Sequence, residues 1–301
     1  MREGVSGTAE VRDAEGHDVT GDALYSQVAW LPQAQRVCWF DIVEKALFEH
    51  RLDDGRTVRH SLPFMASVIA EIDGERQLVA ADEGLFVRSS ADGAFERLLP
   101  LEADKPGNRS NDGRVHQSGA LWIGTMGRNA EKSAGAVYWY AGGRAVRLFA
   151  DITIPNAICF SPDGGTAYFV DSDVGELMRV AVNPDTGLPV GAPAVLRRHG
   201  GHGALDGAVV DTDGAIWVAH WGGACVEAYS PAGDIVKRVS LPATNISCPG
   251  FVGDRLDRMV ATSAWQGMGD ARKAAEPAHG NTFLFDPGVR GLPWPAARPF
   301  A

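Results

Sequence analysis

Three polar residues recur at one offset from a turn glycine. Asn111, Asn156 and Asp206 each lie eight residues before such a glycine. Amide and carboxylate oxygens are the ligands that hard divalent cations such as Ca²⁺ and Mg²⁺ prefer. Asn and Asp also cap strands and form turns, but three of them at one repeat offset favour a shared site. We therefore expect an oxygen-rich cluster that can bind a metal ion.

The same step of eight identifies the corresponding residue in the other repeats. It reaches Ser26 in the first repeat and Ala66 in the second, and Cys248 is the counterpart in an irregular sixth repeat. If the six repeats surround one axis, these positions surround one point, and Asp206 is the only carboxylate among them.

Short β-type runs follow these positions at regular intervals. Their central residues stand 40 to 48 residues apart: Trp39, Val79, Ile123, Phe169, Trp217 and Val260. This is the period of a propeller blade with four short strands. Asp-Gly turns such as Asp163-Gly164 supply the positive φ of tight hairpins. The predicted fold class is all-β, a single six-bladed β-propeller domain over residues 1–301, with about 15–295 in blades and short terminal extensions.

Two further expectations concern the ends of the repeat. The strand near residues 282–285 should pair with an N-terminal strand and close the ring, which removes free sheet edges. Residues 265–279 could hold one helical turn, but a loop is the favoured interpretation. Trp122, Trp217 and Trp221 are interpreted as packing between blades.

Composition narrows the possible partners. The 301 residues carry a net charge of −10, which argues against nucleic acid and anionic membranes and leaves a small-molecule substrate. There is no apolar run of 18 residues, and the N-terminal residues do not predict a secretory leader. The four cysteines include no C-x-x-C pair, so reduced thiols and a cytoplasmic location are expected. The oligomeric state stays open.

At these residues the sequence resembles the senescence marker protein/gluconolactonase family, also called the regucalcin family. The resemblance extends from about residue 24 to residue 293. It rests on residues 108–113 (NRSNDG), 124–126 (GTM), 154–157 (IPNA), 160–164 (FSPDG), 206–207 (DG), 217–223 (WVAHWGG) and 289–293 (VRGLP).

The resemblance implies a six-bladed propeller that binds one divalent metal ion (Ca, Zn, Mn or Mg) and hydrolyses lactones, often sugar lactones. By position it implies that Asn156 and Asp206 are metal ligands and that Arg109 and Asn111 contact the substrate. It also implies that Asp206 is the general base.

One position departs from the family pattern. Members typically carry Leu-Gly-Glu-Gly-Pro-Val-Trp, whose Glu is a metal ligand, whereas residues 24–30 here read LYSQVAW. Ser26 therefore occupies the Glu position. A neutral, shorter side chain replaces a carboxylate there, so we expect the ion to be weakly bound.

Three functions remain open from the sequence. The first is a metal-dependent lactonase, in which the metal polarises the carbonyl, Asp206 takes a proton from water and Arg109 holds substrate oxygens. The second is a non-catalytic propeller that binds a metal or a sugar acid. The third is a hydrolase of another ester or phosphoester. For His199, His202 and His220, loop and hydrogen-bonding roles are favoured over a second metal site.

Overall fold

The computed structural model describes residues 9–10 and 25–300, with side chains from Gln27 onward, in six four-stranded sheets. Blade 1 contains β2 (Tyr25–Leu31), β3 (Arg36–Asp41), β4 (Ala46–Arg51) and β5 (Thr57–Ser61), and blade 2 contains β6 (Ala66–Glu71), β7 (Arg76–Ala81), β8 (Gly84–Ser89) and β9 (Phe95–Leu99). Blade 3 contains β10 (Asn108–Val115), β11 (Leu121–Gly127), β12 (Gly135–Ala141) and β13 (Arg144–Ile152), and blade 4 contains β14 (Pro155–Phe160), β15 (Thr166–Asp171), β16 (Glu176–Ala181) and β17 (Ala194–Arg198). Blade 5 contains β18 (Ala204–Val210), β19 (Ile216–Trp221), β20 (Cys225–Tyr229) and β21 (Ile235–Ser240), and blade 6 contains β22 (Ile246–Val252), β23 (Arg258–Ser263), β24 (Thr282–Phe285) and β1 (Ala9–Glu10).

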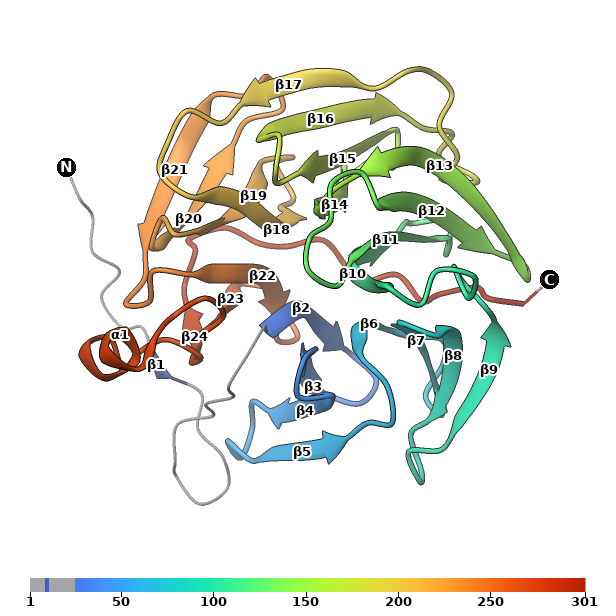
Figure 1. Cartoon of the computed structure of the whole chain (residues 1–301), viewed down its shortest axis with the longest axis horizontal. Coiled ribbons are helices and arrows are strands. Elements are labelled where there is room, and N and C mark those ends of the chain that lie inside the picture. The colour runs from blue at the N-terminus through green and yellow to red at the C-terminus, as the bar shows by residue number, and fades with distance from the viewer. Residues whose placement is uncertain (1–8, 11–24, 301) are drawn as a thin grey trace.

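The six sheets form a ring, so the six-bladed β-propeller is confirmed (Figure 1). The first strand of each blade lies innermost, and each innermost strand contacts those of both neighbouring blades. The expected closure is also confirmed, because β24 pairs antiparallel with β1 and aligns Leu284 with Ala9.

Apolar side chains fill the spaces between successive blades. Trp122 and Trp217 are fully buried there, as predicted, and Trp39 occupies the corresponding place in the first blade. Indole rings of this size bury large apolar areas. They fix the spacing of neighbouring sheets, and with it the positions of the innermost strands.

Every innermost strand carries one extra residue near its start. In β18 the pairing passes from Leu205 to Ala208 while the partner strand advances from His220 only to Val218. The other five innermost strands show the same irregularity. Such β-bulges re-aim side chains and are frequent beside functional sites. Here they line up at one mouth of the channel.

Two local expectations need correction. The positive φ predicted for Asp-Gly turns is present at Gly164 and Gly214, but Gly74, which follows Asp73, does not adopt it. The segment predicted as a loop contains the helix α1 (Asp270–Ala275), which lies at the periphery of the ring (Figure 1). At six residues, this helix is far too short to cross a bilayer, and no longer one occurs in the part of the chain that the structure describes.

The chain after β24 crosses the other mouth of the channel. We call residues 291–300 the C-terminal strap, which runs across the ring towards blades 2 and 3 (Figure 1). Its backbone bonds to three blades, since Gly291 donates to Leu256 O, Ala297 to Glu71 O and Arg298 to Gly119 O. The strap therefore covers the mouth opposite to the bulges.

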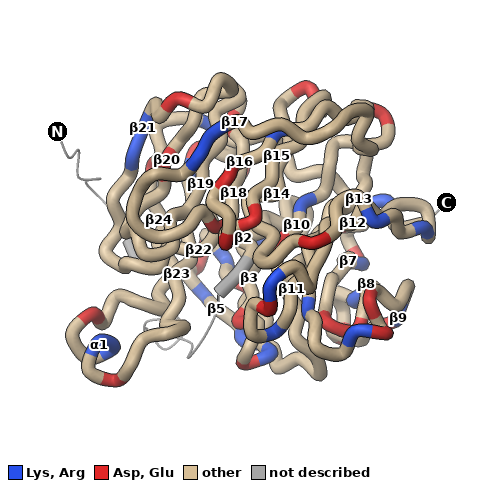
Figure 2. Tube along the Cα trace, turned by 45° about the horizontal axis from the view of Figure 1, so that its top comes forward, with Lys and Arg blue, Asp and Glu red and all other residues tan. Residues whose placement is uncertain are grey.

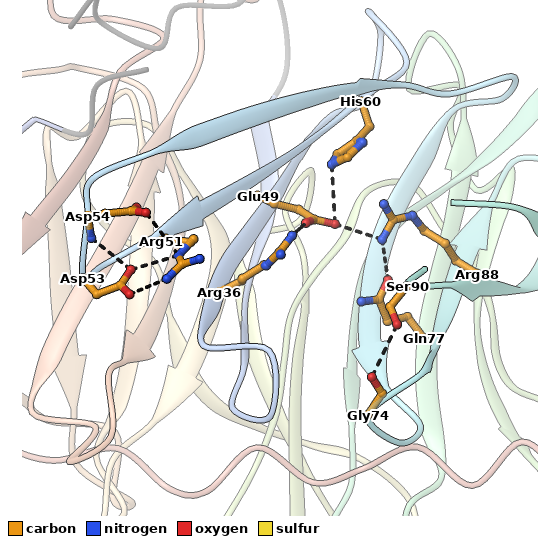
Figure 3. A network of polar contacts seen from close by, with 10 residues as sticks. All are labelled: Arg36, Glu49, Arg51, Asp53, Asp54, His60, Gly74, Gln77, Arg88 and Ser90. Carbon is orange, nitrogen blue, oxygen red and sulfur yellow. Dashed lines mark hydrogen bonds and ion pairs between the residues drawn. The ribbon is translucent and has the colours of Figure 1, made fainter. Parts of the chain in front are cut away.

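A buried carboxylate joins blades 1 and 2 (Figure 3). Glu49 on β4 is 4% exposed, and its Oε1 accepts from Arg88 of β8 at 2.9 Å. Arg36 of β3 also donates to Glu49, and His60 of β5 lies 3.6 Å away. Because each neighbour is basic, the buried charge is compensated across the joint between the two blades.

Candidate functional site

A cavity of about 470 Å³ opens at the channel mouth where the innermost strands begin. Arg109, Asn111, Asn156, Asp206 and Cys248 all line it. Four of these residues, Asn111, Asn156, Asp206 and Cys248, were predicted from the repeat, and they come from blades 3, 4, 5 and 6.

Two predicted positions behave differently. Ala66 is fully buried in the apolar core and does not line the cavity. The side chain of Ser26 lies outside the described residues, but its backbone pairs with Phe40 immediately before the bulge. Asn156 holds the equivalent ladder position in blade 4, where it pairs with Val170 before the bulge.

Hydrogen bonds connect the polar groups of three blades. Arg109 Nη1 donates to Asn111 Oδ1 at 2.8 Å, and Asn111 Nδ2 donates to Asn156 Oδ1 at 2.9 Å. Asn156 Nδ2 in turn donates to Ser172 Oγ at 2.9 Å, and Ser172 Oγ donates to Leu205 O at 2.5 Å. These hydrogen bonds orient the side-chain amides of Asn111 and Asn156. Each Oδ1 accepts one hydrogen bond and keeps a second lone pair.

The backbone around Asn156 and Asp206 is constrained. Ala157, in the bulge beside Asn156, has a φ of 54°, which is unusual for a residue with a Cβ. Gly207, beside Asp206, leaves no room for a side chain, since a Cβ there would lie 2.7 Å from Cys248 Sγ. The Asp-Gly pair thus allows blade 5 to approach blade 6 closely at the mouth.

Asp206 is a carboxylate without a side-chain partner among the described residues. Burial raises its pKa well above the usual value, and the nearby Asp112 carboxylate adds to the shift. The Gly207 amide and Arg109 oppose it. An enclosed carboxylate with no side-chain donor favours either a proton or a cation.

Asp112 is the residue that the sequence analysis missed. It lines the same cavity, so Asp206 is not the only carboxylate there. Its Oδ2 accepts from Ile158 N at 2.8 Å, and burial raises its pKa to about 6, with Arg114 opposing the shift. Its place next to Asn111 in the sequence could have indicated this role, because both residues lie in the β10 bulge.

The rim of the cavity adds Arg128, Asn129, Gln266 and Trp221. Trp221 corrects the expectation of packing between blades, since it is only partly buried and lines the cavity. Arg128 Nη2 pairs with Asp82 Oδ2 at 2.6 Å. Acidic and basic residues are interspersed along the described part of the trace (Figure 2).

Asn156 and Asp206 fit the divalent metal that the resemblance implies. The carboxylate of Asp206 has no other side-chain donor among the described residues, and Asn156 Oδ1 accepts one bond and can take another. Oxygen donors of this kind suit Ca²⁺, Mg²⁺ or Mn²⁺. Asn156 and Asp206 together supply one formal charge, so weak binding of the ion stays the expectation.

His220 behaves as a hydrogen-bonding group, as expected, whereas the buried Nε2 of His199 has no hydrogen-bond partner in the described part of the chain. His220 Nε2 lies 3.0 Å from Tyr229 Oη, which donates to Glu227 Oε2 at 2.7 Å. Arg238 completes this network by donating to Glu227 Oε1 at 3.0 Å. Although His220, Cys225 and Glu227 place possible ligand atoms within 4.8 Å of one another, protein groups already satisfy the histidine and the carboxylate.

Two curated relatives match most of the length of this chain. The chain is 54% identical over 86% of its length to a protein of Rhizobium meliloti (strain 1021) that is named a sugar lactone lactonase, covering 88% of that protein. It is 32% identical over 88% of its length to the L-arabinolactonase of Azospirillum brasilense, covering 89% of that enzyme.

A solved structure shows the same arrangement of strands. The crystal structure of the calcium-binding protein regucalcin from Agrobacterium tumefaciens str. C58 matches with a TM-score of 0.91 at 45% identity, covering 93% of this chain and 96% of the other. A family model described as the SMP-30/Gluconolactonase/LRE-like region matches residues 27–265. The chain therefore belongs to the SMP-30/gluconolactonase/LRE-like family.

Proposed function

We propose that this chain is a metal-dependent hydrolase that opens a sugar-type lactone. The observation that carries the proposal is the meeting of Asn111, Asn156 and Asp206, from three blades, around one cavity that also contains Arg109. The relatives named for sugar lactone and L-arabinolactone hydrolysis support the same substrate class.

In this proposal Asn156 and Asp206 would hold the ion. When bound, a divalent cation supplies a Lewis acid for the lactone carbonyl and favours the ionised form of Asp206. Asp206 takes a proton from the attacking water as the water oxygen bonds to the carbonyl carbon. The ring C–O bond then breaks, and Asp206 returns the proton to the leaving ring oxygen. Arg109, held by Asn111, binds substrate oxygens.

The test is lactone opening by protein stripped of metal and resupplied with Ca²⁺, Zn²⁺, Mn²⁺ or Mg²⁺ in turn. A small panel of pentono- and hexonolactones is used, and acid release is followed. We expect turnover of at least one lactone that depends on added metal. Turnover that persists unchanged in stripped protein would remove the metal from the proposal.

Ser26 favours a second candidate, a non-catalytic propeller that binds a metal or a sugar acid. The family's carboxylate is absent there, so the ion could support binding without fast turnover. Tight binding of a sugar acid, together with no opening of any lactone under any metal, would favour this candidate over the hydrolase.

A further inference from the structure

Arg109 presents one edge of a buried guanidinium to the cavity. The residue is 6% exposed, and its Nη1 donates to Ser110 O at 2.9 Å and to Asn111 Oδ1 at 2.8 Å. Among the described residues nothing accepts from Nε or Nη2, and no carboxylate forms an ion pair with it. The carboxylates of Asp206 and Asp82 act on Arg109 only at longer range, and a buried cation without a direct ion pair is costly to the folded protein. The free Nε–Nη2 edge is suited to a ligand that supplies both acceptors and negative charge.

Arg128 offers a second donor from the β11–β12 loop. Its Nη2 is taken by Asp82, and its Nε donates to Pro106 O at 3.2 Å. Its Nη1 contacts only the sulfur of Met65, at 3.4 Å, and a thioether is a weak acceptor. Arg128 lines the cavity and lies close enough to Arg109 for its charge to act there.

The charges of the cavity favour an anionic ligand. Its charged lining residues are two arginines and two aspartates: Arg109, Arg128, Asp112 and Asp206. Asp82 already pairs with Arg128, and with this carboxylate counted a divalent ion at Asp206 would still leave one excess positive charge. A sugar hydroxyl can accept a hydrogen bond from a guanidinium but brings no charge. A carboxylate accepts two parallel N–H groups and neutralises the cation.

We propose that the substrate is a lactone bearing a carboxylate, such as the lactone of a sugar diacid. Arg109 binds that carboxylate through its Nε–Nη2 edge, and Arg128 Nη1 provides a further donor that determines specificity. This inference rests on the proposed lactonase function and names the substrate class of that same cavity.

The kinetic test uses two lactones that differ only at C6. D-glucaro-1,4-lactone carries a carboxylate there, and D-glucono-1,4-lactone carries a hydroxymethyl group. We expect kcat/KM to be at least about tenfold higher for the carboxylate lactone, as for a charge-assisted bidentate contact. Arg128→Gln should reduce this preference by about tenfold. Equal or better turnover of the neutral lactone by the unaltered protein would overturn the inference.

Two further variants keep the assignment of Arg128 testable. Arg97→Gln is the matched control, because Arg97 is also paired with a carboxylate, Glu83, but lies on the outer strand β9. This variant should leave the preference for the carboxylate lactone unchanged. If Arg128→Gln does not fold because Asp82 is left unpaired, Asp82→Asn combined with Arg128→Gln removes both charges of the pair. An undiminished preference in that double variant would refute the role of Arg128.

A binding measurement separates this inference from the proposed chemistry. Calorimetry on metal-free protein compares D-glucaro-1,4-lactone with D-glucono-1,4-lactone, of which only the first carries a carboxylate. We expect D-glucaro-1,4-lactone to bind about tenfold more tightly, with the difference reduced by salt and by Arg128→Gln. Equal affinity would refute the carboxylate subsite. Absence of turnover on any lactone, with the binding difference intact, would instead refute the hydrolase.

Discussion

Asp206 is the residue on which the proposed chemistry depends most. It lines the cavity without a side-chain donor among the described residues, and it would serve both as a metal ligand and as the acceptor of the water proton. Asp206→Asn keeps the shape of the side chain but removes the proton acceptor. We expect kcat to fall by about 10²–10⁴, the usual contribution of a general base.

The control for this change is binding. Calorimetry with D-glucarate should show an affinity close to that of the unaltered protein, since Arg109 and Arg128 are intact. A kcat that stays near the unaltered value in Asp206→Asn would remove this carboxylate from the mechanism.

Ser26 sets the expected weakness of the metal site. Its backbone occupies the same ladder position as Asn156, at the start of β2. Ser26→Glu should tighten Ca²⁺ binding by about 1–3 kcal/mol, if the new carboxylate behaves as a charge-assisted ligand. Ser26→Gln has the same length without the charge and serves as the control. Titration calorimetry decides the matter, and equal Ca²⁺ affinity in both variants would contradict the assignment.

The repeat predicted several site residues from the sequence because their spacing follows the blades. Asn111, Asn156 and Asp206 came from one offset, and all three line the cavity. Asp112 was missed because the counting took one residue from each blade. In the β10 bulge, two consecutive residues face the same cavity, and sequence alternation gives no sign of this.

At the scale of the strand, the bulges explain why residues at one repeat offset do not hold equivalent positions in the structure. Asn111 and Asp206 lie inside their bulges, whereas Ala66 and Asn156 are the last paired residues before theirs. Ala66 is apolar and packs in the core, and its neighbour Ser67 donates to Ser110 Oγ at 2.8 Å. A register shift of one residue depends on backbone pairing, which composition and spacing do not encode.

The ion pair of Glu49 on β4 with Arg88 on β8 leads to a prediction about stability. Burial alone would raise the pKa of Glu49, but His60, Arg88 and Arg36 together lower it from 4.5 to about 2. Because the folded-state pKa is the lower one, the ionised carboxylate stabilises the fold fully above the unfolded value. This contribution, about 3 kcal/mol, decreases as the pH falls from about 5 towards about 2.

Glu49→Gln tests this directly. The variant should be about 3 kcal/mol less stable at neutral pH, and the difference should narrow as the pH is lowered from about 5 to about 3. Urea denaturation at several pH values measures it. Glu83→Gln, which breaks the exposed pair with Arg97, is the control and should cost no more than about 1 kcal/mol. A gap that does not change with pH would show that packing, not charge, accounts for the loss.

At the scale of the whole molecule, the sequence predicted the six-bladed ring but not the position of the C-terminal strap. The period of the β-runs gave six blades, and the need to close the last sheet gave the pairing of β24 with β1. The C-terminal strap has no such period. Residues 289–293 were recognised as a motif, but only the structure places the segment that follows β24 across the far mouth of the channel. An extended segment rich in proline carries no pattern that indicates which surface it will cover.

Trp294 anchors this strap and leads to the last prediction. Its Nε1 donates to Phe251 O at 2.9 Å, and its ring lies over the Arg114 guanidinium at 4.6 Å. Arg114 is a buried cation whose Nε and Nη1 have no hydrogen-bond partner, so the aromatic face is an important part of its environment. Trp294→Ala removes the indole, its hydrogen bond and this contact together.

We expect Trp294→Ala to cost about 2–3 kcal/mol, somewhat less than for a fully buried tryptophan, because the ring is only partly covered. Lactone turnover should be unaffected, since the strap lies at the mouth opposite to Asp206. Phe300→Ala is the matched control, because Phe300 lies on the same strap, is 47% exposed and stacks with Arg76 at the surface. Thermal and urea denaturation compare the two variants. Equal losses would mean that the contact with Arg114 adds nothing, and a selective loss of turnover in Trp294→Ala would mean that the far mouth takes part in the reaction.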